Sequence, residues 1–210
     1  MRPLMNELIA LRKGGSRIAH RLPFAGRILD ARRRRTRRSL LEAMPRHSVC
    51  AEVGVWRGAF SQVILDVVRP RELHLIDPWT FQADVTVWAG GARAADHAYM
   101  DAMHDDVVGR FRERPEVVVH RADSATAAQL FPAGYFDWVY IDADHRYTAV
   151  KDDLEKYEVL VKPGGFVTGD DYYWRPDLGM PVKRAVDERV KHGAVELVSV
   201  TDSQFILRKR

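Results

Sequence analysis

The stretch "AEVGVWRGAFS", residues 51–61, decides the fold of this chain, because it combines the end of a strand, a glycine turn and the start of a helix. The apolar run that leads into Glu52 is typical of a short buried strand. Gly54 permits a tight turn, and a small residue there lets a ligand approach the backbone closely. The helix that begins near Ala59 exposes unpaired N–H groups in its first turn. This order favours an α/β domain with a ligand site at the turn.

The sequence around this stretch alternates apolar runs with amphipathic segments. Strands are predicted within 47–55, 72–79, 116–123, 136–144 and 164–173, and two closing strands within 195–209. Helices are predicted at 59–68, 95–114, 124–131, 146–161 and 181–193. Such alternation is typical of a parallel sheet with helices on both faces, where ligands bind beyond the carboxyl ends of the strands. We predict a seven-stranded, mostly parallel sheet.

Polar residues at the ends of the second and third predicted strands are typical of a nucleotide site. Asp77 ends the second strand 25 residues after Glu52, close to the roughly 20-residue offset at which an acid binds ribose in dinucleotide folds. Asp123 and Ser124 end the third strand, where polar groups meet an adenine. These positions predict a ligand that contains a nucleoside.

The glycine pattern differs from the fingerprint of dinucleotide-binding proteins. Glu52-x-Gly54-x-x-x-Gly58 lacks the G-x-G-x-x-G spacing that cradles a pyrophosphate. An acid before the glycine repels phosphate and suits a ligand with an amino group. A glycine pair of this kind also occurs in turns that serve the fold alone.

Acidic residues follow the fourth and fifth predicted strands. Asp142 ends the fourth, in "VYIDADHRY", and Asp170 and Asp171 end the fifth, in "GGFVTGDDYY". Three unneutralised carboxylates at neighbouring strand ends would raise each other's pKa values. A hard divalent ion such as Mg²⁺, which prefers oxygen ligands, resolves this repulsion. We predict a magnesium site at these residues; the alternative is a solvated turn at 170–171 and a helix cap at Asp142.

The stretch "YIDADHRYTAVKDDLEKYEVLVKPGGFVTGDDY", residues 140–172, is similar to metal-dependent O-methyltransferases of the class I S-adenosylmethionine-dependent family. The resemblance covers roughly residues 48–208 and implies a Rossmann-like fold that ends in an antiparallel strand pair. It also implies cofactor contacts for the residues named above. In this family Glu52, Gly54 and Gly58 would lie near the methionine portion, Asp77 would hold the ribose, Asp123 and Ser124 would border the adenine, and Asp142 would serve both cofactor and metal.

The paired acids Asp170-Asp171 narrow the resemblance, because catechol-type relatives usually carry Asp-Asn there. The chain resembles the macrocin O-methyltransferase branch, which methylates sugar hydroxyls. Its length and basic character are similar to those of a mycobacterial enzyme that methylates the reducing-end 1-OH of a mannose oligosaccharide. The resemblance implies Mg-dependent methyl transfer from S-adenosylmethionine to a sugar hydroxyl. A catechol or phenol O-methyltransferase and an RNA methyltransferase are the alternatives.

A base is needed to take the proton of a sugar hydroxyl, which is far too weakly acidic to ionise at neutral pH. His145 is the first candidate, because the unperturbed pKa of histidine is near 6.5. Asp144 is the second candidate. Each also has a structural interpretation, since His145 suits a helix start and Asp144 suits a cap for the helix that begins near Arg146.

The residues that would contact the acceptor are predicted less directly. Aromatic side chains that could stack on a sugar ring are Trp79, Phe81, Trp88, Tyr172, Tyr173 and Trp174. Arg175 could bind an acidic acceptor or lie on the surface, and Gly90-Gly91 suits a lid that excludes water. The aromatic residues are equally suited to a core. His97, His104, His120 and His192 lack paired metal spacing, so we assign them structural roles.

Residues 1–46 carry the basic charge of the chain, with 13 Lys/Arg against 3 Asp/Glu, whereas the remainder carries 20 against 26. We predict a basic helical extension over 1–46, broken at "KGG" and "RLPFAG", followed by a methyltransferase domain over 47–210. The run "ARRRRTRRS", residues 31–39, favours a basic helix that packs on the domain or on a partner subunit of a homodimer. The alternative is an anchor for nucleic acid.

The bulk composition is that of one soluble domain of 210 residues, 46% hydrophobic and 30% charged. No apolar run reaches the roughly 20 residues that cross a bilayer, and no signal peptide is visible. The single cysteine, Cys50, lies in an apolar run and cannot form an internal disulfide. We therefore expect a buried thiol and a cytoplasmic protein.

Overall fold

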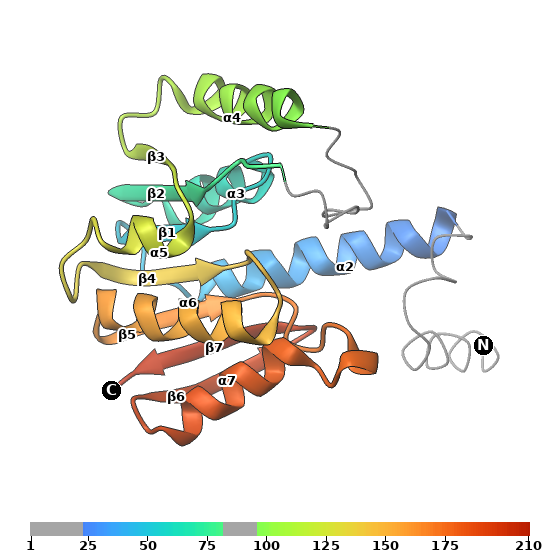
Figure 1. Cartoon of the computed structure of the whole chain (residues 1–210), viewed down its shortest axis with the longest axis vertical. Helices are drawn as coiled ribbons and strands as arrows, with labels where there is room; N and C mark the ends of the chain where they lie inside the picture. The colour runs from blue at the N-terminus through green and yellow to red at the C-terminus, as the bar shows by residue number, and fades with distance from the viewer. Residues whose placement is uncertain (1–22, 82–95) are drawn as a thin grey trace.

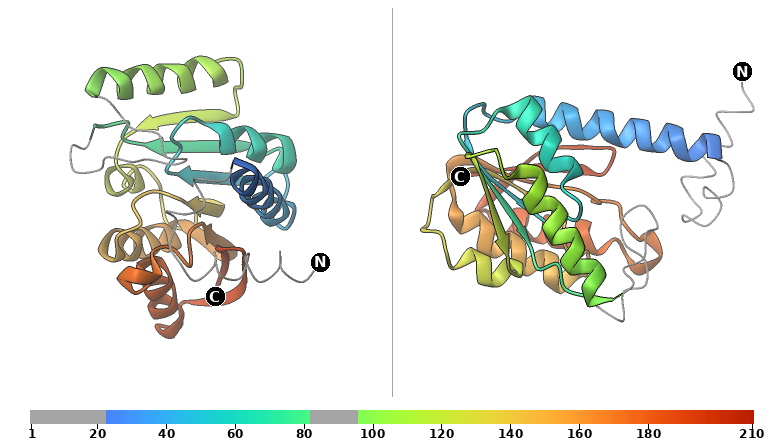
Figure 2. Two further views of the ribbon diagram at one scale, coloured as in Figure 1. Left: turned by 90° about the vertical axis from the view of Figure 1, so that its right-hand side faces the viewer. Right: turned by 90° about the horizontal axis from the view of Figure 1, so that it is seen from above.

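The computed structural model describes residues 23–81 and 96–210, which form a sheet between two layers of helices (Figures 1 and 2). The helices are α2 Pro23–Glu42, α3 Ala59–Val68, α4 His97–Phe111, α5 Ser124–Ala128, α6 Tyr147–Leu160, α7 Pro181–Lys191 and the short 3₁₀ helix η3 Pro176–Leu178. The strands are β1 Val49–Val53, β2 Glu72–Asp77, β3 Val117–Arg121, β4 Phe136–Ile141, β5 Val161–Gly169, β6 Val195–Thr201 and β7 Gln204–Lys209.

The sheet has seven strands in the order β3-β2-β1-β4-β5-β7-β6. The first five run parallel, and β7 pairs antiparallel with both β5 and β6. The chain starts at β1 in the middle, winds outward to β3 and returns to β4, so the strand order reverses between β1 and β4. The predicted Rossmann-like sheet with a closing antiparallel pair is confirmed. In sheets of this kind the point of reversal is where ligands bind.

Each face of the sheet has its own buried core. On one face the apolar sides of α2, α3 and α4 pack on the sheet, with Ile64 and Met100 among the buried residues. On the other face α5, α6 and α7 pack on it, with Leu154 and Val186 buried. All five residues of β1 are buried, and four of them are apolar, because a central parallel strand contacts helices on both sides; the exception is Glu52.

Helix α2 covers the second half of the basic segment. "RLPFAG" was expected to break the helical segment, and α2 begins within it, at Pro23, and continues through Gly26; the residues before Pro23 lie outside the described part of the chain. Proline is well tolerated in the first helical turn, where its missing N–H would have no partner. Leu40, Leu41 and Met44 then pack in the same core as α3. The "KGG" break lies outside the described residues, and the domain boundary after 46 and the homodimer stay predictions.

The described residues contain no helix long and apolar enough to cross a membrane. The mean apolar character of α2, the longest helix, is low because its middle carries the arginine run. Its ribbon extends past the edge of the sheet (Figure 2).

Candidate active site

The glycine turn after β1 lies against the end of β4. Gly54 has a φ of +93°, and its N–H donates to the carbonyl of Ile76 on β2 at 2.9 Å. A Cβ built on Gly54 would lie 2.2 Å from the backbone oxygen of Asp142. Glycine is therefore required here both by the left-handed backbone and by the close approach of the neighbouring chain. The turn and Asp142 form one surface at the reversal point of the sheet.

Asp77 at the end of β2 holds this turn in place. One of its carboxylate oxygens accepts hydrogen bonds from the backbone N–H groups of Val55 and Trp56, at 3.0 and 2.9 Å. The other accepts from the backbone of Trp79 at 2.8 Å. Burial raises the pKa of Asp77, and these N–H donors oppose the shift. The carboxylate predicted to hold a ribose thus also shapes the loop.

Glu52 lies buried beneath the turn. Its carboxylate accepts a hydrogen bond from the Ser61 hydroxyl at 2.5 Å. Burial raises the pKa of Glu52 to about 8, against the Ser61 hydrogen bond and the charge of Arg37, while Asp142 and Asp77 add to the rise. A group of acids that mutually disfavour ionisation provides a favourable environment for a cationic ligand.

Asp123 and Ser124 at the end of β3 make local structural contacts. Asp123 caps α5, since its side chain accepts from the backbone N–H and the hydroxyl of Thr126 at 2.8 and 2.9 Å. The carbonyl of Ser124 accepts from the Tyr157 hydroxyl on α6 at 2.9 Å. The contacts predicted between these two residues and an adenine stay predictions.

The predicted acids meet at the ends of β4 and β5. The N–H of Asp142 donates to Val53 on β1 at 2.8 Å, and the N–H of Asp170 donates to Ile141 on β4 at 3.3 Å. Each acid therefore continues the ladder by one hydrogen bond beyond the strand end. Asp171 follows with a φ of +58°, and after this left-handed residue the N–H of Tyr172 donates to the carbonyl of Ser203 at 2.9 Å. The sheet places all three carboxylates in one cluster, which we call the acid cluster.

His145 faces two members of the acid cluster. Its Nε2 atom lies 3.0 Å from Asp171 Oδ2 and 3.4 Å from Asp142 Oδ1. Burial lowers the pKa of His145, but the hydrogen bonds and charges of Asp142 and Asp171 outweigh this and raise it to about 10. His145 is therefore protonated at neutral pH in this arrangement and has no capacity to accept another proton at Nε2.

Asp142, His145 and Asp171 have the geometry and donor atoms for a divalent cation. Their ligand atoms all lie within 4.8 Å of one another. The Nε2 atom of His145 is buried and has no well-aligned hydrogen bond, although both carboxylates are close. Two carboxylates and one imidazole form a donor set that divalent metals accept. These three residues thus fit a metal ion. The predicted set was Asp142, Asp170 and Asp171, whereas here the third ligand is His145 in place of Asp170.

Two arginines of α2 form ion pairs with the acid cluster. Arg37 donates to Asp170 Oδ2 from Nε at 3.0 Å and from Nη2 at 2.5 Å, and its Nη2 also donates to Asp142. Arg33 donates to the same Asp170 oxygen at 2.9 Å from Nε, and its Nη2 lies 3.5 Å from Asp171. The three carboxylates of the acid cluster therefore have two guanidinium groups and one imidazolium as partners.

The charges of this cluster shift its pKa values in opposite directions. Burial and the charge of Asp142 raise the pKa of Asp170, against the guanidinium charges. Burial also acts to raise the pKa of Asp171, but the His145 hydrogen bond and the charge of Arg33 outweigh it, so this pKa is lowered. Neither arginine was predicted to lie at this site. Their spacing of four residues indicates a shared helix face, but nothing in the sequence indicates which acids that face meets.

Asp144 lies beside the acid cluster in sequence but has a different partner. It accepts from the backbone N–H of Arg146 at 2.8 Å and from the Arg146 guanidinium at 2.7 Å. These bonds close a turn before α6 and hold the carboxylate on Arg146. The structure thus places His145, rather than Asp144, against the acid cluster.

The predicted acceptor residues fall into two groups. Trp79 and Tyr172 are buried, at 0% and 4% exposure, so neither presents an open ring face in this structure, and their contact with an acceptor stays a prediction. Burial follows from neighbours outside the local sequence: the Tyr172 hydroxyl donates to Asp187 on α7 at 2.6 Å. Trp174 and Tyr173 remain candidates, since the ring of Trp174 lies 5.2 Å from that of His145 and Tyr173 is 45% exposed.

The other predicted residues contribute less to the site. Arg175 donates to Asp177 at 2.8 Å and lies over the Trp174 ring at 5.7 Å. Phe81 packs partly buried against the α3 core. Trp88, Gly90 and Gly91 lie outside the described residues. The remaining histidines contact aromatic rings or acids: His97 with Phe81, His104 with Trp79, His120 with His74 and His192 with Glu188.

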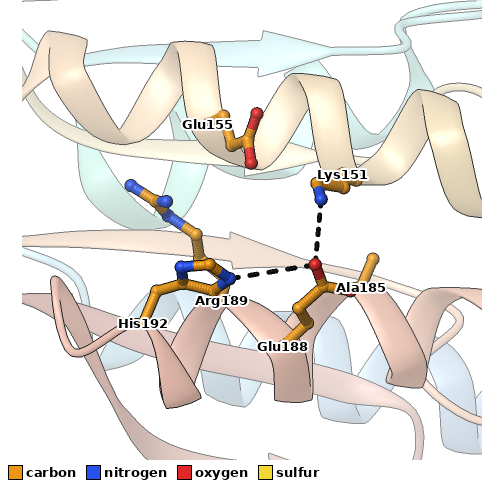
Figure 3. A pocket seen from close by; sticks show the side chains of 6 residues that line it. All are labelled: Lys151, Glu155, Ala185, Glu188, Arg189 and His192. Carbon is orange, nitrogen blue, oxygen red and sulfur yellow. Dashed lines mark hydrogen bonds and ion pairs between the residues drawn. The ribbon is translucent and has the colours of Figure 1, made fainter.

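Two hollows on the described surface lie away from the acid cluster. One, between α6 and α7, has a volume of about 10 Å³, which is too small for a cofactor, and is crossed by the ion pair of Lys151 with Glu188 (Figure 3). The other, of about 180 Å³, lies between α2 and the β6–β7 pair and is lined by residues such as Ser39 and Gln204. Neither is lined by a predicted site residue.

Comparison with known proteins agrees with this geometry. A family model described as "Methyltransferase domain" matches residues 51–172, which include the glycine turn and the acid cluster. No curated protein matches the chain.

Solved structures share the fold over most of the chain. The O-methyltransferase NovP is 24% identical and superposes with a TM-score of 0.58, covering 85% of this chain and 79% of its own. Fibrillarin of Aeropyrum pernix, in complex with natively bound S-adenosyl-L-methionine, is 14% identical with a TM-score of 0.53, and the match covers 83% and 73%. The N-methyltransferase NodS of Bradyrhizobium japonicum is 16% identical with a TM-score of 0.52, and covers 83% and 93%.

Proposed function

Because this chain belongs to the family of methyltransferase domains, we propose that it transfers a methyl group from S-adenosylmethionine to a carbohydrate hydroxyl with the help of a divalent metal. The observation that carries the proposal is the convergence of Asp142, His145 and Asp171, with ligand atoms within 4.8 Å, directly beside the glycine turn. In finer detail, the resemblance of the sequence suggests the reducing-end 1-OH of a mannose oligosaccharide.

The family match and the turn around Gly54 support S-adenosylmethionine as the methyl donor. Fibrillarin, which shares the fold, was solved with this molecule bound. The methionine portion of the donor carries a cationic amino group and a sulfonium. Glu52, Asp77 and Asp142 surround the turn, and each would interact favourably with positive charge.

The metal part of the proposal rests on the donor set. Asp142, His145 and Asp171 would hold the ion, with Asp170 as a further candidate. A bound divalent ion stabilises negative charge on a nearby hydroxyl oxygen and so makes its proton easier to remove. The resemblance of the sequence to metal-dependent O-methyltransferases implies the same role for an ion at Asp170 and Asp171. NovP, an O-methyltransferase, shares the fold.

The side chains of the chain itself would position the acceptor and move its proton. Asp142 and Asp171 orient the His145 ring from two sides. The Trp174 ring packs against His145 and could support a sugar ring at the same edge of the sheet. An ion at Asp142 and Asp171 would offset their negative charge and so favour neutral His145. His145 could then accept the proton only where Asp170, and not the Nε2 atom of His145, completes the ligand set, because a nitrogen bound to a metal has no free lone pair.

A methyl-transfer screen tests the proposal. Purified protein, labelled S-adenosylmethionine and Mg²⁺ are incubated with mannose oligosaccharides, other glycosides, catechols and RNA. We expect transfer to a carbohydrate and loss of that transfer in excess chelator, restored by added Mg²⁺. Transfer to catechol alone would favour the phenol-directed alternative, and salt-sensitive transfer to RNA would favour the nucleic-acid alternative. Full transfer to sugar in chelator would reject the metal.

The identity of the base is tested by two substitutions in one loop. His145→Ala is expected to lower kcat by roughly 10²–10⁴-fold, the range typical of a lost general base. Asp144→Ala is expected to change kcat much less, because its carboxylate is held by Arg146. Steady-state kinetics with saturating cofactor measure both. The reverse pattern, with Asp144→Ala the crippled variant, would assign the base to Asp144.

A further inference from the structure

We propose that Arg33 and Arg37 set the metal affinity of the acid cluster by competing with the divalent cation for Asp170 and Asp142. The inference rests on the proposed metal-dependent function and adds residues of α2 to that site. It assigns two members of the arginine run to the methyltransferase chemistry, where the sequence alone suggested only a packing helix or an anchor for nucleic acid.

The competition follows from how completely the guanidinium groups engage Asp170. Its Oδ2 atom accepts from Nε and Nη2 of both Arg33 and Arg37. Its Oδ1 atom accepts from the backbone N–H of Asp171 at 2.7 Å. A carboxylate offers about four lone-pair sites, and the Asp170 side chain is only 1% exposed. In this arrangement Asp170 has little capacity left for a metal ion.

Arg37 extends the same competition to Asp142. Its Nη2 atom bridges Asp170 and Asp142, while the other Asp142 oxygen faces His145. A divalent ion bound by Asp142 would therefore lie close to a fixed positive charge. Like charges at such distances repel strongly where solvent is largely excluded, so each guanidinium weakens the binding of the ion.

The side chains can withdraw without unfolding α2. Leu40 and Leu41 anchor the C-terminal half of the helix in the core, at 5% and 1% exposure. Thr36 donates to Asp202 at 2.9 Å from the same stretch, which ties the helix to the β6–β7 turn. The helix thus stays in place, and displacement of the guanidinium groups requires rotation of two side chains.

The two arginines differ in how easily they withdraw. The Arg33 side chain is 46% exposed and can turn into solvent. Arg37 is 20% exposed, and its guanidinium lies 5.0 Å from the Phe60 ring centre, a contact that favours retention of the cation. Arg33 is therefore expected to leave first and Arg37 to account for most of the effect on affinity.

The test measures metal affinity directly, without turnover. Mn²⁺ is titrated into the cofactor-free full-length protein, with free Mn²⁺ followed by electron paramagnetic resonance and the result repeated with Mg²⁺ by calorimetry. The variants are Arg33→Ala, Arg37→Ala and the double substitution. Arg35→Ala is the matched control, because Arg35 is an exposed residue of the same helix and its loss removes the same charge.

We expect the double variant to bind Mn²⁺ at least tenfold more tightly than the wild type, Arg33→Ala to show a smaller gain and Arg35→Ala to stay near the wild type. Equal Mn²⁺ affinities in all proteins, or a gain in Arg35→Ala as large as in the double variant, would overturn the proposed competition and leave the metal site itself unaffected. Absence of Mn²⁺ binding in every variant would overturn the metal site as well. Arg33→Ala keeps the test valid if loss of Arg37 destabilises the fold, which circular dichroism would show.

Discussion

Asp142→Asn is expected to lower methyl-transfer turnover by about 10³-fold. Asp142 lies between His145 and Arg37, and its ligand atom is within 4.8 Å of those of His145 and Asp171. Asn has nearly the same shape but no charge, so it replaces an anionic metal ligand with a weaker, neutral one. It also leaves His145 and Arg37 without one of their anionic partners. Several kcal/mol of lost charge stabilisation corresponds to a rate loss of this size.

The measurement separates chemistry from cofactor binding. Turnover is measured with saturating Mg²⁺, and S-adenosylmethionine affinity is measured by calorimetry. The backbone N–H of Asp142 donates to Val53 and is unaltered by the substitution, so cofactor affinity should change far less than turnover. Asp152→Asn serves as the control, because Asp152 is an exposed acid on α6 whose side chain pairs only loosely with Lys156, at 3.6 Å. Turnover of Asp142→Asn equal to that of this control would contradict the proposed site.

Gly54→Ala is expected to destabilise the fold by about 3 kcal/mol or more and to abolish measurable binding of S-adenosylmethionine. The φ of +93° is unfavourable for alanine. A Cβ at 54 would also lie 2.2 Å from the Asp142 carbonyl oxygen and 2.8 Å from Ala143 Cα. Both contacts are to backbone, so the turn or the end of β4 must shift, and the cofactor-binding surface shifts with it.

A second glycine provides the matched control. Gly109 lies within α4, and a Cβ built on it meets nothing within 4 Å. Gly109→Ala should therefore leave cofactor affinity unchanged and add about 0.5–1 kcal/mol of stability, as expected inside a helix. Denaturant unfolding and calorimetric titration measure both variants. If Gly54→Ala matched Gly109→Ala in stability and affinity, the role assigned to the glycine turn would be wrong.

Local sequence patterns predicted most of the fold. Helix α3 was predicted at 59–68 and has those bounds, because its apolar spacing is regular and Gly58 and Arg69, both in the left-handed conformation, delimit it. The strand ends that hold Asp77, Asp142 and Asp170 were also placed within a few residues. Period and composition determine such elements wherever tertiary contacts agree with local preference.

Two features depend on neighbours that the local sequence does not reveal. Pro23 was expected within a break between helical segments, and α2 begins at this residue, as proline in a first helical turn allows. Trp79 and Tyr172 were assigned to an acceptor surface, yet both are buried. An aromatic residue next to a predicted site has the same local sequence whether it faces the ligand or the core.

By itself, the sequence determined the order of strands and helices, the glycine turn and the three acids at strand ends, because each depends on residues close together in the chain. Only the tertiary structure decided the partners of those acids. Arg33 meets Asp170 across 137 positions, and Arg37 meets Asp142 across 105. The physical reason is that charge can be counted along the chain, whereas the pairing of charges depends on the strand order and on the helix face that packs against it.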